Sequence, residues 1–260
     1  MRINDNMFKC LNMIMINECN KTCEYCDIPT VDSKSYRRIS LDDINYIDKI
    51  LEYCFSIYNF DDNKHEIIFL GGELGLLSTE ILTELYDITI KYANLHQIMW
   101  MTNGLIFTKI PWILDTDINM DIHITDAIID VPLVIKSNVK YTVVATKFNM
   151  ESVNKIRTQL DSVGITNYHI KPCNSIRNGY MGNMEDNPNK IYKNIMFNKI
   201  DCNNRSLFFA MDFTDRTLYK CCRSYTRFER KPMTHDNIRL AFDGNLFEKS
   251  EICLRCKRLK

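Results

Sequence analysis

Short apolar runs, rich in β-branched and aromatic residues, recur along the first two thirds of the chain with helical patterns between several of them. The candidate strands are 11–16, 66–70, 97–102, 120–125, 141–146 and 167–171. Each run has the length of a buried strand and is too short for a typical helix. The pattern therefore predicts six strands.

Three segments between these runs carry apolar residues at steps of three and four, the spacing of an amphipathic helix. Ser40 and Asp43 have the spacing of a capping box before the first of them. Ser78 or Thr79 caps the second helix, and Gly164 ends the third. The apolar stripes are Ile44, Ile47, Leu51, Cys54, Phe55 and Tyr58, then Ile81, Leu82, Leu85, Ile88 and Tyr92, then Met150, Val153, Ile156, Leu160 and Val163.

Strands that alternate with helices specify parallel βαβ units, which form either an open doubly wound α/β sheet or an incomplete barrel. Near residue 198 the pattern changes. Residues 207–213, a turn at 214–216 and residues 217–222 predict a β-hairpin. We therefore expect one domain over 1–198 and a small second unit over 199–260.

Composition adds one unusual feature, the cysteine content. Hydrophobic residues make up 45% of the 260 positions and charged residues 25%, as in ordinary globular proteins, but there are eleven cysteines. The N-terminus lacks a secretion signal, so we expect a cytoplasmic protein whose reduced cysteines are metal ligands or catalytic groups. No apolar stretch reaches the length of a membrane span. Residues 199–260 hold 14 Lys or Arg against 8 Asp or Glu, an excess too small to predict nucleic-acid binding.

Cys19, Cys23 and Cys26 form a C-x3-C-x2-C motif directly after the first predicted strand. In parallel α/β folds the reactive site lies in loops at the carboxyl ends of strands. Three thiolates hold three irons of a [4Fe-4S] cubane and leave the fourth iron open to a chelating substrate. The alternatives to an iron-sulfur cluster are buried structural thiols or a zinc site. Structural zinc requires four ligands, and Asp27 is not a convincing fourth ligand.

The motif resembles that of the radical S-adenosylmethionine (SAM) superfamily, C-x3-C-x-aromatic-C, with Tyr25 as the aromatic residue. The resemblance implies that the open iron binds SAM and that one-electron transfer yields methionine and a 5′-deoxyadenosyl radical. It also implies that Gly71, Gly72 and Glu73, after the second strand, contact the SAM ammonium group, because glycines permit close backbone approach. Leucine follows Glu73 here, where many relatives have proline.

Further strand ends resemble the same family. Asn103 lies in MTNG after the third strand, and Thr125 with Asp126 ends the fourth. Each has turn capping as its alternative role, whereas the resemblance implies cofactor contacts. It also implies a partial (β/α)6 barrel, followed by a small C-terminal β-hairpin module for an auxiliary cluster.

A second set of cysteines occupies the C-terminal segment, where Cys202, Cys221, Cys253 and Cys256 have the number of ligands that closes a zinc or iron-sulfur site. The spacing resembles the half-length auxiliary-cluster module called Twitch, which implies a second [4Fe-4S] cluster with a role in electron transfer. Arg216 stands where that module has a glycine. Cys221 fits the register better than its neighbour Cys222, which would point to the opposite face of a strand.

Four cysteines have no assigned metal, namely Cys222 and three others. Cys10 and Cys54 fall on apolar positions and are expected to be core residues. Cys173 ends the sixth predicted strand, at the rim of the expected barrel. It is either a buried structural thiol or a hydrogen-atom donor of the kind radical epimerases use.

The sequence thus predicts a radical SAM enzyme that abstracts hydrogen from a C–H bond and depends on an external reductant such as flavodoxin or ferredoxin. The favoured outcome is maturation of a ribosomally made peptide by cross-linking, oxidation or epimerisation. One alternative is dehydrogenation of a small polar metabolite such as an amino sugar or aminocyclitol. A non-enzymatic iron-sulfur or zinc binding module is the other.

Overall fold

The computed structural model describes residues 10–23, 37–58, 66–93, 97–124, 129–145, 149–172, 208–219, 230–243 and 246. All six predicted strands are present, as β1 (Cys10–Ile16), β2 (Glu66–Gly71), β3 (Gln97–Thr102), β4 (Asn119–Ile124), β5 (Val139–Ala145) and β6 (Tyr168–Pro172). They pair in parallel in chain order. The predicted α/β class and parallel topology are therefore confirmed.

The three predicted helices are α1 (Leu41–Ile57), α2 (Thr79–Ala93) and α3 (Met150–Ser162). Short 3-10 helices follow β2 and β3, namely η1 (Leu74–Leu76), η2 (Leu105–Thr108) and η3 (Pro111–Asp115). Before α1, the Ser40 N–H donates to Asp43 Oδ2 at 2.9 Å, the backbone half of the predicted capping box.

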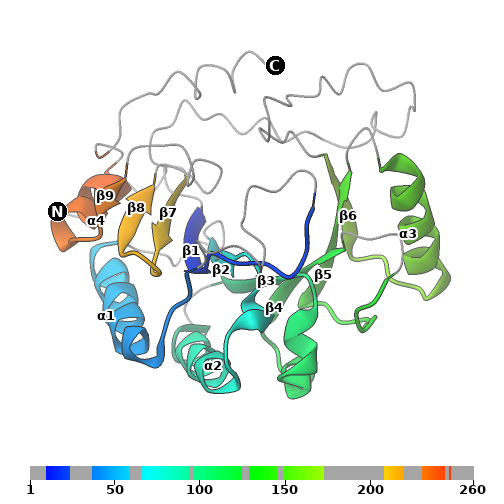
Figure 1. Ribbon diagram of the computed structural model, residues 1–260, viewed down its shortest axis with the longest axis horizontal. Helices are drawn as coiled ribbons and strands as arrows, with labels where there is room; N and C mark the ends of the chain where they lie inside the picture. Colours follow the sequence, from blue (N-terminus) through cyan, green and yellow to red (C-terminus); the bar gives the residue numbers. More distant parts are fainter. Residues whose placement is uncertain are drawn as a thin grey trace, which may run out of the picture.

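The core lies between one face of the sheet and these helices. Figure 1 shows α1, α2 and α3 on the outer side of a curved sheet. Inside this layer Trp100 of β3 is fully buried and donates its indole N–H to Thr89 Oγ1 of α2 at 2.9 Å. Cys54 is fully buried in the same layer, as expected for a core residue.

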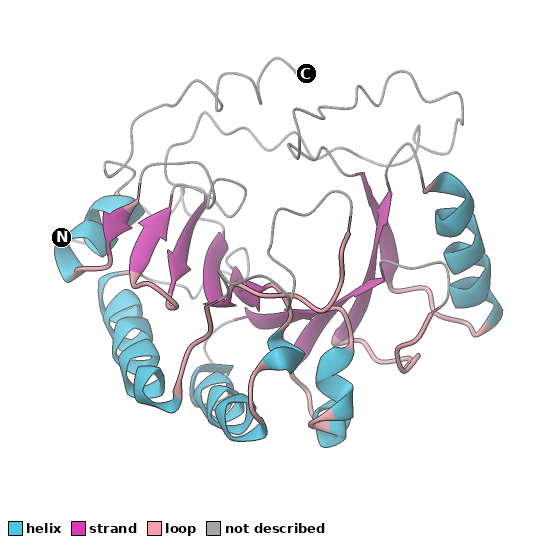
Figure 2. Cartoon of the chain, in the orientation of Figure 1, coloured by secondary structure: helices cyan, strands magenta, loops and turns pink. Residues whose placement is uncertain are grey.

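The hairpin after residue 198 continues the same sheet. Strand β7 (Phe208–Asp212) pairs in parallel with β1, and β8 (Thr217–Tyr219) and β9 (Lys231–Pro232) follow in antiparallel pairing. The sheet order is β6-β5-β4-β3-β2-β1-β7-β8-β9, visible in Figure 2 as one curved row of strands. Helix α4 (His235–Phe242) ends this part of the chain. Strand β1, with the cysteine motif after it, is consequently central in the sheet.

Candidate metal centre

The cysteine loop begins at the carboxyl end of β1, as the sequence predicts. Cys19 is buried and Cys23 is half-buried. The Cys19 sulfur accepts hydrogen bonds from the backbone N–H of Lys21 at 3.4 Å and from Asn103 Nδ2 at 3.6 Å. Hydrogen bonds to the sulfur atoms are one of the features by which proteins tune iron-sulfur clusters. The Cys19 sulfur therefore lies beside two N–H donors just after the carboxyl end of β1.

Gly71 and Gly72 lie against the backbone of this loop. The Gly72 N–H donates to the Ile16 carbonyl at 2.9 Å, and the Glu73 N–H donates to the Glu18 carbonyl at 2.9 Å. A Cβ atom on Gly72 would lie 1.7 Å from the Glu18 carbonyl oxygen. The structure thus adds a reason for the glycine pair that differs from ligand approach: the chain's own cysteine loop occupies the space of a side chain.

Glu73 ties the end of β2 to the end of β3. Its fully buried carboxylate accepts from the Gly75 N–H at 2.8 Å, the Thr102 hydroxyl at 2.6 Å and the Asn103 N–H at 2.5 Å. Burial raises the pKa of Glu73 above its ordinary value, and these three donors offset that effect only in part. The Glu73 carboxylate therefore holds the end of β2 and the residues at the end of β3 in a fixed relative position.

Sequence reasoning missed an ion pair that anchors the loop. Glu18, fully buried, accepts from Arg38 Nε at 2.6 Å and Nη2 at 2.8 Å, and Arg38 also donates to the Leu76 carbonyl at 3.3 Å. Such a bidentate ion pair fixes the relative orientation of the two side chains as well as pairing their charges. In the sequence, Glu18 directly before Cys19 could have drawn attention to this ion pair. Its partner Arg38 lies 20 residues further along the chain, so the pairing could not be read from the local sequence.

A second polar group lies on the sheet face opposite the helices, on β4, β5 and β6. Asp121 Oδ1 accepts from the Thr142 hydroxyl at 2.5 Å, and His123 Nε2 and Lys140 Nζ lie 3.6 and 3.9 Å from its Oδ2. The Thr142 hydroxyl is 3.4 Å from His169 Nδ1. We call Asp121, His123, Lys140, Thr142 and His169 the inner-face cluster. The sequence analysis did not predict this cluster, because its members come from three different strands.

The pKa values of Asp121 and His169 in the inner-face cluster lie below those of the free amino acids. Although burial raises the pKa of Asp121, the His123 imidazole, the Thr142 hydroxyl and the Lys140 ammonium lower it to about 2. Burial and the Lys140 charge lower the pKa of His169 to about 4. At neutral pH the cluster therefore presents a carboxylate and a neutral imidazole.

Strand register places His123, one member of the inner-face cluster, beside the end of β3. Thr102 pairs with Ile122, and His123 pairs with Thr142. Asn103 directly follows Thr102 at the end of β3, and His123 directly follows Ile122 in β4, so both lie at the same level of the sheet. The cluster therefore extends the polar site from β2 and β3 across to β6.

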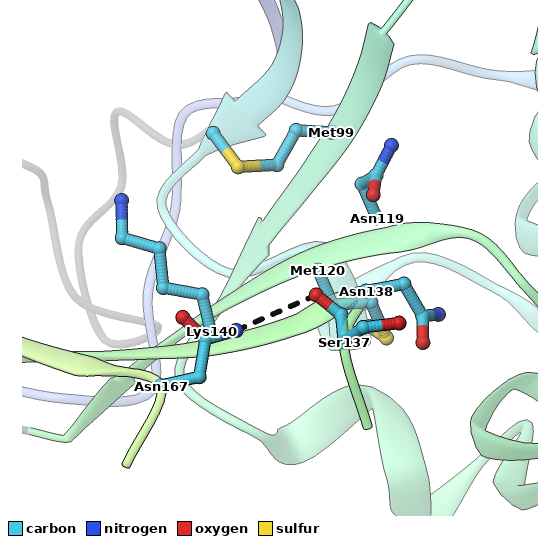
Figure 3. Close-up of a pocket in the computed structure, with 7 residues that line it drawn as sticks. All are labelled: Met99, Asn119, Met120, Ser137, Asn138, Lys140 and Asn167. Carbon is cyan, nitrogen blue, oxygen red and sulfur yellow. Dashed lines mark hydrogen bonds between the residues drawn. The ribbon is translucent and has the colours of Figure 1, made fainter. Parts of the chain in front are cut away.

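A shallow pocket of about 220 Å³ lies at the opposite, amino end of the strands. Its lining is Met99, Asn119, Met120, Ser137, Asn138, Lys140 and Asn167. There, Asn167 Nδ2 donates to the Ser137 carbonyl at 3.5 Å (Figure 3). This pocket contains none of the residues predicted to bind a cofactor or metal.

The other predicted site residues, Tyr25, Cys26, Thr125, Asp126, Cys173, Cys202, Cys221, Cys253 and Cys256, lie outside the described residues. Within the described ranges, no three His, Cys, Asp or Glu side chains come together as a metal site. Of the predicted residues that are described, the structure gathers Cys19, Gly72, Glu73 and Asn103 at one place.

A comparison of the sequence with known protein families supports the prediction of an iron-sulfur protein. Residues 9–152 match the family described as the 4Fe-4S single cluster domain. This segment covers more than half of the chain and includes the Cys19, Cys23 and Cys26 motif. The chain belongs to this family of iron-sulfur proteins.

Two solved structures illustrate what the chain is similar to. Native anSMEcpe with bound AdoMet shares 16% identity over 63% of this chain and 51% of its own, with a TM-score of 0.46. BtrN in complex with AdoMet and 2-DOIA shares 14% identity over 99% of this chain and 89% of its own, with a TM-score of 0.49. The chain thus spans about half the length of anSMEcpe. No curated protein matches it, and none of the helices in the described ranges is long and apolar enough to span a membrane.

Proposed function

We propose that the protein is a radical SAM enzyme whose cluster is held by Cys19, Cys23 and Cys26. The observation that carries this proposal is the Cys19 sulfur at the end of β1, which accepts two N–H hydrogen bonds in a chain of the 4Fe-4S family. When bound and reduced by an external donor such as flavodoxin or ferredoxin, the cluster would supply the electron that cleaves SAM to methionine and a 5′-deoxyadenosyl radical.

The surrounding residues have separate tasks in this proposal. Gly71 and Gly72 let the cysteine loop rest on the end of β2, and the Glu18–Arg38 pair prevents that loop from rotating away. Asn103 lies beside the Cys19 sulfur, where it would also meet SAM. Among the predicted SAM contacts, Tyr25, Gly71, Gly72, Glu73, Thr125 and Asp126 complete the set.

The test is anaerobic reconstitution with iron and sulfide, followed by measurement of bound iron and of 5′-deoxyadenosine formed from SAM after reduction. We expect Cys23→Ala to lose both, because each thiolate holds one iron. Cys54→Ala is the matched control, since Cys54 is buried in α1 away from the site, and we expect it to retain both. Zinc in place of iron, or undiminished cleavage by Cys23→Ala, would contradict the proposal.

For the substrate, we propose a ribosomally made peptide that undergoes cross-linking, oxidation or epimerisation in the cytoplasm. In an epimerisation, Cys173 would return a hydrogen atom to the substrate radical. The specific test is deuterium transfer from a labelled precursor peptide into 5′-deoxyadenosine. A short precursor gene beside this one would supply the candidate peptide.

A small polar metabolite is the second candidate, and the inner-face cluster favours it. An ionised Asp121, a neutral His169 and Lys140 offer acceptors and donors suited to hydroxyl and amino groups. Deuterium transfer from a labelled aminocyclitol or amino sugar, and none from peptide, would establish this alternative.

A further inference from the structure

Asn103 is held in one orientation by four contacts. Its backbone N–H donates to Glu73 Oε2 at 2.5 Å, and its side-chain Oδ1 accepts from the Leu105 N–H at 3.3 Å. With Oδ1 engaged, the amide group points its Nδ2 at the cysteine loop. There Nδ2 lies 2.7 Å from Asn20 Oδ1 and 3.6 Å from Cys19 Sγ.

The two Nδ2 hydrogens match these two neighbours. An amide NH2 group has two donors, and within the described part of the chain the oxygen of Asn20 and the sulfur of Cys19 both accept from it. A separation of 3.6 Å is suitable for a donor to sulfur, whose radius exceeds that of oxygen. Because Cys19 is 8% exposed, this contact lies in surroundings that screen charge poorly.

We infer that Asn103 raises the reduction potential of the cluster by donating a hydrogen bond to the Cys19 thiolate. This inference rests on the proposed function, because it needs Cys19 to be a cluster ligand. Reduction adds negative charge that spreads onto the sulfur ligands, so an N–H dipole directed at one of them stabilises the reduced state more than the oxidised state. Asn103 would thereby make the first electron easier to accept.

A purely structural role for Asn103 predicts something different. The Oδ1 contact with Leu105 caps the turn into η2, and Gly104 in that turn has φ +99°. Loss of this cap would lower the free energy of unfolding and leave the potential of a retained cluster unchanged. The reduction potential therefore separates the two roles.

The experiment compares the reconstituted full chain with Asn103→Leu, which keeps the side-chain size and removes the donor. Potentials are measured by EPR-monitored redox titration, and the first cluster is identified by the change of its signal when SAM is added. Exchangeable protons near the cluster are counted by pulsed ENDOR in H2O and D2O. The matched control is Asn167→Leu, the same substitution at the amino end of the sheet, where Asn167 Nδ2 donates to the Val139 carbonyl at 2.7 Å.

We expect Asn103→Leu to shift the potential to a more negative value and to lose one exchangeable-proton coupling, while that of the Lys21 N–H remains. Asn167→Leu should match the wild type in both measurements. If Asn103→Leu binds no cluster, Asn103→Ser is measured in its place. The serine hydroxyl can still accept from the Leu105 N–H, but the serine side chain is too short to reach the Cys19 sulfur.

An unshifted potential in an iron-loaded Asn103 variant would overturn the inference and leave the proposed function intact. A wild-type protein that takes up no cluster would overturn both. A shift of equal size in Asn167→Leu would also overturn the inference, since it would show a general effect of the substitution.

Discussion

At the scale of single residues, two glycines illustrate different reasons for lacking a side chain. Gly72 leaves room for the cysteine loop, since an added Cβ would meet the Glu18 carbonyl oxygen at 1.7 Å. Gly164, which ends α3, has a left-handed backbone with φ +79°, and the nearest atom to its added Cβ lies 3.8 Å away. The first glycine is required by packing and the second by backbone conformation.

Alanine at these two positions should therefore have different consequences. We expect Gly72→Ala to displace the loop, to cost about 2–4 kcal/mol in the free energy of unfolding and to reduce reconstituted iron. Gly164→Ala should cost about 1 kcal/mol and leave iron binding unchanged. Urea unfolding and iron analysis on both variants measure this, and full iron binding by Gly72→Ala would contradict it.

At the scale of secondary-structure elements, the turn between β7 and β8 contains Arg216, where the sequence comparison with the Twitch module led us to expect a glycine. Arg216 has φ +56°, a left-handed conformation that glycine adopts without strain. Its side chain compensates by an ion pair with Asp43 Oδ1 at 3.0 Å and a position 4.6 Å from the centre of the Tyr46 ring. Arg216 thus fastens the hairpin to α1.

Substitution at this turn should separate backbone strain from side-chain contacts. Arg216→Ala loses both contacts and keeps the strain, so we expect a loss of about 1–2 kcal/mol in the free energy of unfolding. Arg216→Gly loses the same contacts but relieves about 1 kcal/mol of strain, so it should be more stable than the alanine variant. Chemical denaturation of the two variants decides this, and equal stabilities would contradict the strain argument.

At the scale of the whole molecule, the segment after residue 198 shares the sheet and part of the core of the preceding domain. Strand β7 lies beside β1, and in α4 the Phe242 ring stacks on Tyr58 with centroids 5.2 Å apart. The division at residue 198 stays a prediction. What the described residues show is that β7 borders β1, the strand that leads into the cysteine loop.

The proposed second cluster can be tested at this scale. In Cys253→Ala with Cys256→Ala we expect iron to fall from about eight to about four per chain, because two of four thiolates are removed. Formation of 5′-deoxyadenosine without substrate should persist, since the first cluster keeps its open iron, and product formation should stop. Some loss of protein yield is expected, because metal binding contributes to folding in a small module. Retention of all iron would show that other residues are the ligands.

The amino-acid sequence alone determined the six parallel strands and the three main helices, and it placed the cysteine motif after β1. Periodicity reveals strands and helices because each buries one face locally. The Cys19, Cys23 and Cys26 motif and the turn at 214–216 are each contiguous in the chain, so both could be recognised in the sequence as well. For Gly72 and Glu73 the sequence predicted the place at the end of a strand, but not the contacts with the cysteine loop and with Asn103.

Only the tertiary structure decided which distant residues meet. Periodicity shows that a strand is buried but does not name its neighbours, so the position of β7 beside β1 had no local signal. The contact of Asn103 with Cys19 joins residues 84 positions apart. The inner-face cluster joins three strands in the same way. Such contacts depend on the order in which strands assemble, a property of the folded sheet that is not written in any single segment.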